Sequence, residues 1–344
     1  MRMFADRLAQ MQAAIAPQKK GRGGNPPQQR KVAAVATKTR QQPWEWRSST
    51  AADMDDIIEA YGGDLQSVPE EWLEFNHALA TLRNKRIMVP MYRNGRFSTE
   101  EIPLPADQYE KRFTVHFMSL FGGSGNLEQA FLKGGLQVGM WVDIACCTEF
   151  QCKPVNVLDC DTRQTIWAFL IVFMPEWVHS GFPCTFWSPL SRFCNRRSPE
   201  TNQQKRLEAL AFVIFTCQVL TWQGIIRGGK ASYENGIGCS SHKLDIVQGM
   251  VQDMEMKRYA TAACAWGGCD PDSGKPLAKQ RLFVANWDCS RIVKKCTCPG
   301  GKGKGTHQRT IGKAKGGKRT RAQYSGMYES ALCDEFVVAF LGCR

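Results

Sequence analysis

FMSLFGGSGNLEQAF, residues 117–131, is a short apolar run followed by a glycine turn and a segment with helical spacing. A parallel α/β sheet uses this order of elements to hold a nucleotide-like cofactor, because glycine lets the backbone turn tightly off a strand and approach a ligand closely. The turn contains Gly122, Gly123 and Gly125. By itself the pattern is a weak signal, since a plain tight turn has the same residues.

Strand and helix patterns alternate through the rest of the chain. The expected strands are residues 114–120, 137–143, 177–182, 230–234, 259–266 and 280–286. The expected helices are residues 126–133, 165–173, 207–222, 244–257 and 328–341. Strands separated by helices imply a mostly parallel sheet with helices on both faces. We therefore predict an α/β fold with a Rossmann-like, mostly parallel sheet.

These patterns divide the chain into regions. We expect a disordered basic N-terminal arm at 1–45, a small α+β appendage at 46–110, a Rossmann-like domain at 111–290, and a basic Gly/Lys-rich loop with a C-terminal helix at 291–344. The arm is rich in Pro, Gly, Gln, Lys and Arg and has little apolar surface to bury. Within the appendage, a helix is expected to begin at Pro69. Asn94-Gly95 between apolar flanks predicts a β-hairpin.

The charge of the chain is large and unevenly placed. The 344 residues include 45 Lys+Arg and 32 Asp+Glu, a formal net charge of +13. Residues 1–48 hold ten basic and two acidic side chains, and residues 291–321 hold eleven basic and no acidic ones. We expect these two segments to bind a polyanionic partner, most simply nucleic acid. The alternative is that they are solvated tails that aid solubility.

The cysteine count and the apolar runs indicate in which cellular compartment the protein is expected and whether it spans a membrane. Fifteen cysteines are an odd number without regular spacing, and the first residues show no secretory signal. Free thiols in a reducing, intracellular compartment, the nucleus or the cytoplasm, are therefore expected. The apolar run at 166–174 is too short to span a bilayer, and polar residues interrupt the longer run at 207–226. We interpret the second run as a buried helix and expect no membrane partner.

Acidic side chains follow the expected strands, at the edge where open α/β sheets bind ligands. Asp143 ends the second strand and can accept hydrogen bonds from ribose hydroxyls. Asp159 or Asp161 can accept one from the amino group of an adenine, and the same residues can instead cap a helix. Glu234 ends a later strand, where a carboxyl group can protonate or hydrogen-bond a ring nitrogen.

A nucleophile and two cations complete the set of candidates. Cys184 follows Pro183 at a strand end, and a thiolate there can attack an electron-poor carbon. The alternative is a buried structural thiol. Neighbouring aromatic rings, Phe182, Phe186 and Trp187, offer stacking surfaces for a flat substrate. Lys279 and Arg281 precede an apolar strand and can bind phosphate or polarise a carbonyl group, unless they are ordinary surface cations.

Four blocks occur in a telling order: SLFGGSGN at 119–126, GFPCTFWS at 181–188, ENG at 234–236 and PLAKQR at 276–281. Through them, residues 114–286 resemble the cytosine-5 DNA methyltransferases, which have the class I S-adenosylmethionine-dependent fold. The chain also resembles, more distantly, methyltransferase-like proteins of mobile or viral elements. Phe182 and Leu277 replace a Pro and a Gln of the family pattern, and few residues follow Arg281, where the family has a DNA-reading region.

The resemblance implies a cofactor, S-adenosylmethionine, and a mechanism. A cytosine flipped out of the duplex would be attacked at C6 by Cys184, with Glu234 at N3 and Arg281 steadying the base or its phosphate. Asp143 would hold the ribose and Asp161 the adenine amino group. The implied cofactor-binding residues are Phe121, Gly122, Gly123, Gly125, Asn126, Asp143 and Asp161.

Two other functions remain open from the sequence. A methyltransferase acting on RNA or on an exocyclic nitrogen would need the cofactor site but not the thiol of Cys184. A non-catalytic protein could keep the fold and bind nucleic acid through its basic segments, with steep salt dependence.

One further cluster concerns metal. Cys289, Cys296, Cys298 and His307 could form a Cys₃His zinc site that folds the basic loop. Their spacing is irregular, and we favour the alternative of free cysteines, so no metal ligand is assigned from the sequence.

Overall fold

The computed structural model describes residues 74–103, 114–144, 150, 154–189, 199–299, 306–309 and 327–344. The arm at 1–45, the helix start expected at Pro69 and residues 310–321 of the basic segment lie outside these residues.

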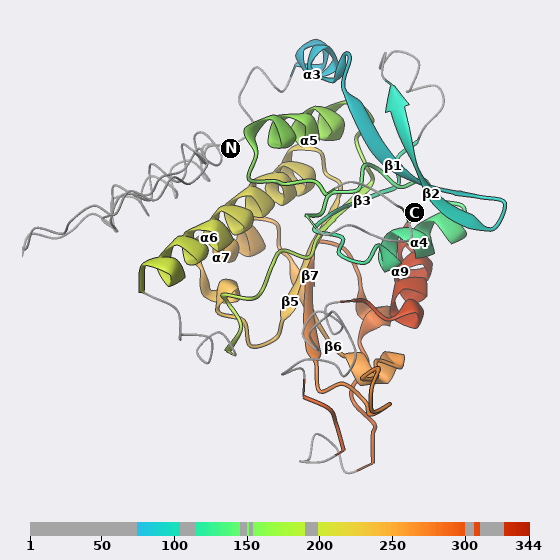
Figure 1. The fold of residues 1–344 in the computed structure, drawn as a ribbon, viewed down its shortest axis with the longest axis vertical. Helices are drawn as coiled ribbons and strands as arrows, with labels where there is room; N and C mark the ends of the chain where they lie inside the picture. Colours follow the sequence, from blue (N-terminus) through green and yellow to red (C-terminus); the bar gives the residue numbers. More distant parts are fainter. Residues whose placement is uncertain are drawn as a thin grey trace, which may run out of the picture.

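A five-stranded sheet forms the centre of the molecule (Figure 1). Its strands are β3 (Phe117–Leu120), β4 (Trp177–Ser180), β5 (Lys230–Gly236), β7 (Gln280–Ala285) and β6 (Lys257–Ala262), in that spatial order. β3, β4 and β5 are parallel. Parallel bridges from Phe117 to Val138 and from Leu120 to Val142 extend the sheet beyond β3. The Rossmann-like, mostly parallel α/β fold expected from the sequence is confirmed.

β7 differs from the other strands in direction. It pairs antiparallel with β5 on one side and with β6 on the other. A parallel pair needs a crossover connection, usually a helix. Residues 263–279, which join β6 to β7, contain only the short 3₁₀ turn η6 (Ala263–Trp266), so the chain returns beside β6 in the opposite direction.

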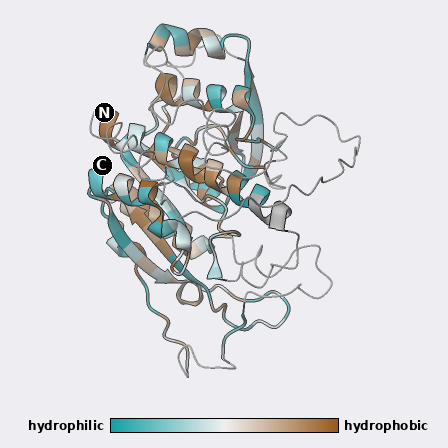
Figure 2. Ribbon diagram, turned by 90° about the vertical axis from the view of Figure 1, so that its left-hand side faces the viewer, coloured by the Kyte–Doolittle hydropathy of each residue, from teal (hydrophilic) through white to brown (hydrophobic). Residues whose placement is uncertain are grey.

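Helices cover both faces of the sheet (Figure 1). α4 (Asn126–Lys133) and α9 (Ser330–Gly342) pack together on one face. The other face carries α5 (Cys160–Phe173), α6 (Pro199–Thr221) and α7 (Asp245–Asp253). Successive residues of a strand therefore enter different cores: Phe117 and Trp177 face α9, while Met118 and Val178 face α5 and α6. Figure 2 shows the hydrophobic residues concentrated on the sheet and on the helices against it.

The longest apolar helix lies inside the fold. By length and composition alone, the stretch Gln204–Ile226 could cross a membrane, but 67% of its apolar window is buried inside the molecule. It comprises most of α6 and a turn of π-helix, η4 (Trp222–Ile226). Packing against the sheet and α7 accounts for its apolar character.

The described part of the expected appendage is a helix and a hairpin. α3 (Phe75–Leu82) precedes β1 (Arg86–Arg93) and β2 (Arg96–Pro103), whose turn at Asn94-Gly95 has φ angles of 52° and 76°. The hairpin expected there is confirmed. Its buried residues belong to the same core as α5 and α6, and the N–H of Trp141 donates a hydrogen bond to the carbonyl of Met88 (3.3 Å). The boundary at residue 110 stays a prediction.

Candidate active site

The glycine turn joins β3 to α4 and meets Asp143. The N–H of Phe121 donates to the carbonyl of Val142 (2.7 Å), which holds the turn against the neighbouring extended segment. The N–H of Gly123 donates to the Asp143 carboxylate (2.6 Å). Gly123 and Gly125 have φ angles of 60° and 74°, a left-handed conformation that glycine adopts without steric cost. The turn and the acid singled out from the sequence therefore lie together.

The glycines of this turn serve different purposes. A Cβ added to Gly122 would overlap the Glu128 carboxylate and the Ser119 hydroxyl, so packing alone requires glycine there. A Cβ added to Gly123 would meet nothing within 4 Å. The open side of the turn, next to Asp143, is thus the side on which a ligand can approach.

Glu128, which sequence reasoning did not select, lies buried in the first turn of α4. Its side chain accepts a hydrogen bond from the Ser119 hydroxyl, and its Oε2 atom has no partner among the described residues. Burial raises the pKa of Glu128 to about 7. The burial of Glu128 could not be predicted from the sequence, because an acidic residue in the first turn of a helix is usually exposed.

Glu128→Gln should make the stability of the protein less dependent on pH. A carboxyl group whose pKa is raised in the folded state stabilises the fold fully below its unfolded pKa of about 4.5 and loses that contribution as pH rises through about 7. Between pH 4.5 and 8 the variant should gain about 2–3 kcal/mol of unfolding free energy relative to the wild type. Urea unfolding at both pH values measures this. Glu101→Gln, at an exposed residue, is the control, and equal pH dependence of both variants would contradict the prediction.

Phe121 and Asn126 are held by segments far away in the sequence. The Phe121 ring meets the edge of Phe212 at 5.4 Å between centroids. The side-chain amide of Asn126 donates to the carbonyl of Tyr328 (2.6 Å). Asn126 therefore ties the start of α4 to the segment before α9.

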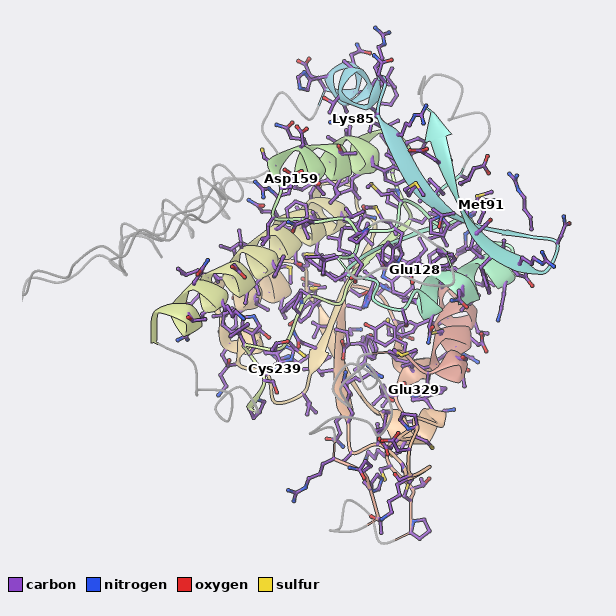
Figure 3. The ribbon with its side chains drawn as sticks, in the orientation of Figure 1. Lys85, Met91, Glu128, Asp159, Cys239 and Glu329 are labelled. Carbon is purple, nitrogen blue, oxygen red and sulfur yellow. The ribbon has the colours of Figure 1, made fainter. Side chains whose placement is uncertain are left out.

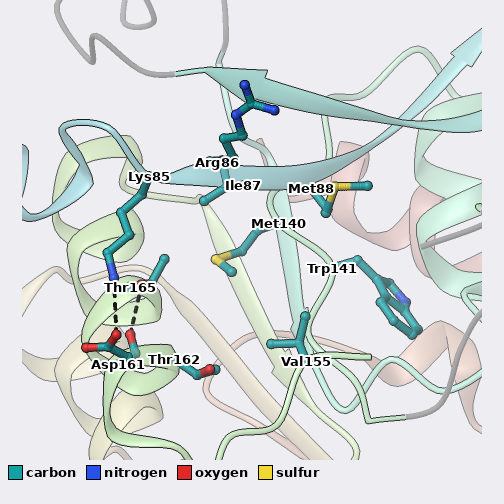
Figure 4. A pocket seen from close by; sticks show the side chains of 10 residues that line it. All are labelled: Lys85, Arg86, Ile87, Met88, Met140, Trp141, Val155, Asp161, Thr162 and Thr165. Atoms are coloured by element: carbon teal, nitrogen blue, oxygen red, sulfur yellow. Dashed lines mark hydrogen bonds and ion pairs between the residues drawn. The ribbon is translucent and has the colours of Figure 1, made fainter. Parts of the chain in front are cut away.

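Asp161 lies at the start of α5, beside Lys85. Asp159 is the residue that caps α5, since its carboxylate accepts from the N–H of Thr162 (2.9 Å). Asp161 is exposed and forms an ion pair with Lys85 at 3.6 Å, across a small pocket that Trp141 also lines (Figure 4). The adenine contact expected for Asp161 stays a prediction.

Cys184 lies just beyond the end of β4, in a turn where its carbonyl accepts from the N–H of Ser188 (2.8 Å). A hydrogen bond from the thiol of Cys239 lowers the pKa of Cys184 to about 7. The charge of Lys279 acts in the same direction, while burial and the charge of Glu234 oppose it. Cys239 follows β5 in the chain (Figure 3) and was not selected from the sequence, because its contact with Cys184 is tertiary.

The alkylation of Cys184 should report this environment. The rate of reaction with iodoacetamide, followed by peptide mass spectrometry, should rise with pH around a midpoint near 7, because the thiolate is the nucleophile. Cys239→Ala removes the hydrogen bond and should move the midpoint upward by about one unit. Cys160, an exposed thiol at the start of α5, is the internal reference. A midpoint at or above that of Cys160 would contradict the prediction.

The aromatic neighbours of Cys184 differ from expectation. Phe182 and Trp187 are 3% and 4% exposed and belong to the core, so neither offers a free stacking face. Phe182 packs instead against Tyr233, with 5.7 Å between ring centroids. Phe186 is partly buried against the same core. These rings position the Cys184 turn.

Arg281 is wholly buried and bound by the segment before α9. Its guanidinium donates to the carbonyl of Met327 (2.5 Å) and to the Glu329 carboxylate (2.9 Å), and lies 5.0 Å from the centroid of the Tyr328 ring. Glu234 is 4.0 Å from it on the other side. Contact between Arg281 and a base or its phosphate would require these contacts to open, and the role expected for Arg281 stays a prediction. Of the two cations in the block at 276–281, Lys279 is the one whose charge lowers the pKa of Cys184.

A polar strip crosses the α9 face near the carboxyl ends of the strands. His179 hydrogen-bonds the Ser232 hydroxyl through Nδ1 (2.8 Å) and the Tyr328 hydroxyl through Nε2 (2.9 Å). Burial lowers the pKa of His179 to about 3, so its ring is neutral at physiological pH. Figure 3 shows Glu329 at the start of α9, from where it reaches this strip. None of His179, Tyr328 or Glu329 was expected from the sequence.

Several buried polar atoms of this region have no hydrogen-bond partner among the described residues, although Glu234 Oε1 and Arg281 Nη1 form the ion pair at 4.0 Å. They are Oε1 of Glu234, Nε and Nη1 of Arg281, and Oε2 of Glu329. Buried polar groups are normally hydrogen-bonded, so a group of unpartnered atoms indicates a place for water or a ligand.

No protein-family model matches this chain, and no curated protein matches it in sequence. Among solved structures, the chain is similar to a mutant of DNMT2 from Spodoptera frugiperda, with 14% sequence identity and a TM-score of 0.31. The similarity covers 58% of this chain and 56% of that one, so the chain spans little more than half the length of the protein it matches. The fold assignment rests on the strand order and helix packing described above.

Proposed function

We propose that this protein transfers a methyl group from S-adenosylmethionine to C5 of cytosine in nucleic acid, with DNA favoured over RNA. The observation that carries the proposal is the environment of Cys184, which lies in the turn after β4 beside the Cys239 thiol, the Lys279 charge and the Glu234 carboxyl group, and whose pKa the Cys239 hydrogen bond lowers. A structural cysteine has no need of a lowered pKa, whereas a nucleophile does.

The residues at the glycine turn fit the proposed cofactor. The open side of Gly123 leaves room for a ligand, and Asp143, which already meets the turn, has the chemistry to accept hydrogen bonds from a ribose. Phe121 lies at the same turn, where its ring can contact the adenosine. When bound, S-adenosylmethionine supplies an electrophilic methyl group.

The chemistry assigned to the protein's own residues is addition followed by elimination. The Cys184 thiolate forms a bond to C6 of the cytosine, while Glu234 holds a proton at N3. The added electron density at C5 makes that carbon the nucleophile for methylation. Loss of the C5 proton to solvent and expulsion of the thiolate then restore the ring. Lys279 favours the thiolate before attack and after release.

The partner in this proposal is nucleic acid, bound through segments 1–48 and 291–321. Arg291, Lys294 and Lys295 are exposed at the start of the second segment. Their charge, together with that of the rest of both segments, supports attraction to phosphate groups. A target base must also be flipped from its stack to reach Cys184.

The direct test is transfer of labelled methyl from S-adenosylmethionine to a mixture of DNA and RNA, followed by nucleoside mass spectrometry. Label in 5-methylcytosine of DNA is the expected result. Label in RNA would keep the chemistry and change the substrate, and label on an exocyclic nitrogen would overturn the role of the thiol. A folded protein that binds nucleic acid and gives no label would overturn the proposal in favour of a binding function.

A further inference from the structure

Four metal-ligating side chains converge away from the candidate active site. The Sγ atoms of Cys264, Cys296 and Cys298 and a ring nitrogen of His307 all lie within 4.8 Å of one another. Sγ of Cys296 is 3.3 Å from Nε2 of His307. All three cysteines are free thiols. The set draws on η6, on the extended segment after η7 (Ser290–Ile292), and on residues 306–309.

The spacing of these atoms fits a tetrahedral zinc ion. Zinc binds thiolate at about 2.3 Å and imidazole at about 2.0–2.1 Å, so tetrahedral ligand atoms lie about 3.8 Å apart or slightly less. Three thiols and an imidazole are a donor set that favours zinc over harder cations such as magnesium or calcium. Four protein ligands leave no open position, which is typical of a structural site.

The surroundings of the set hold it in this arrangement. The Thr306 hydroxyl lies 3.0 Å from Nδ1 of His307, which orients the ring so that Nε2 faces the thiols. Such an outer hydrogen bond is usual for histidine ligands of metals. The N–H of Ala262 donates to the carbonyl of Lys294 (2.9 Å), and the N–H of Gln308 donates to the carbonyl of Pro276 (2.8 Å). Each ligand segment is therefore fixed to the sheet or to the connection before β7.

We propose that Cys264, Cys296, Cys298 and His307 bind one structural Zn²⁺. The ligand set differs from the one considered from the sequence, because Cys289 is wholly buried in the core beside α9. Cys264 takes its place, more than thirty residues before the other ligands in the chain, where no spacing rule would find it. Three thiolates and a zinc ion leave one negative charge, which the exposed Lys294 and Lys295 offset.

The zinc ion would join segments that come from different parts of the chain. It would fasten the end of β6 to the extended segment and to residues 306–309, which bridge to Leu277. The N–H of Ala278 donates to the carbonyl of Gln308 (2.9 Å), and Lys279 follows directly. The same ion would close the chain between Cys298 and His307, which includes the basic residues Lys302 and Lys304.

The test uses the full chain, expressed in zinc-supplemented medium, with metal measured by inductively coupled plasma mass spectrometry. We expect one equivalent of zinc in the wild type and its loss in Cys264→Ser and in His307→Ala. Removal of zinc by a chelator should lower Tm by about 5–10 °C. Cobalt substitution should give the intense visible bands of a tetrahedral thiolate site.

Cys269→Ser and Cys289→Ser are the matched controls, since Cys269 is an exposed thiol nearby and Cys289 belongs to the other ligand set. Both should keep one equivalent of zinc. Wild-type protein without zinc whose thiols all titrate as free would overturn the proposal, as would full zinc in Cys264→Ser or its loss in Cys289→Ser alone. If Cys264→Ser fails to fold, His307→Ala decides, because it removes a ligand from a short, partly exposed connection. These outcomes do not depend on methyl transfer.

Discussion

Cys184→Ser should lower methyl transfer to nucleic acid by a factor on the order of 10⁴ or more. The Cys239 hydrogen bond and the Lys279 charge favour the thiolate form of Cys184. A serine hydroxyl in the same place stays protonated and is a poor nucleophile without an adjacent base. The measurement is the labelled-methyl assay, with S-adenosylmethionine binding followed in parallel by calorimetry.

Binding of the cofactor should be unchanged in this variant, since Asp143 and the glycine turn are untouched. Cys160→Ser, at an exposed position on α5, is the matched control and should keep full activity. Transfer that persists in Cys184→Ser would remove the covalent mechanism and favour methylation of a nitrogen atom. Loss of both transfer and cofactor binding would instead point to a structural role for the thiol.

Arg281→Met should lower the free energy of unfolding by about 3–5 kcal/mol. Arg281 is 0% exposed and is the cation between two buried acids, Glu329 at 2.9 Å and Glu234 at 4.0 Å. Removing it takes away the ion-pair partner of Glu329 and leaves Lys279 as the nearby buried cation for both acids, a cost larger than the gain from the pair itself. Urea unfolding at neutral pH measures the effect.

Arg291→Met provides the comparison within the same molecule. Arg291 forms an ion pair with Glu335 at 2.6 Å, but its side chain is 57% exposed. Solvent screens such pairs, so the change should cost at most about 1 kcal/mol. The double variant Arg281→Met/Glu329→Gln should recover part of the loss, because one of the stranded charges is gone. Equal costs for Arg281→Met and Arg291→Met would contradict the prediction.

Several helices and turns of the fold could be predicted because local sequence patterns determine them. α4 has the bounds expected from its apolar spacing, and the Asn94-Gly95 turn lies where its left-handed preference places it. The direction of β7 could not be predicted from its own residues, because their apolar character is typical of a buried strand in either direction. Direction depends on the connection before it, where 263–279 lacks a crossover helix. The strand expected at 137–143 is reduced to two bridges with β3.

The candidate site was predictable where residues lie at strand ends along the chain. Cys184, Glu234 and Asp143 could be selected as candidates because the carboxyl ends of parallel strands meet at one edge. Cys239, Tyr328 and Cys264 were not, since each acts through a partner distant in the sequence. The burial of Arg281 was missed for the same reason: a charged residue before an apolar strand is usually exposed, and its acidic partner Glu329 comes 48 residues later.

The packing of α9 has a consequence for synthesis on the ribosome. The face of the sheet that carries Phe117 and Trp177 is covered by α9 as well as α4, and the contact between Asn126 and Tyr328 spans 202 residues. At ordinary elongation rates, α9 emerges roughly 10–40 s after α4. During that interval the aromatic face of the nascent chain is without part of its cover, so it is a natural binding surface for chaperones. This face of the sheet is therefore fully covered only after α9 has left the exit tunnel.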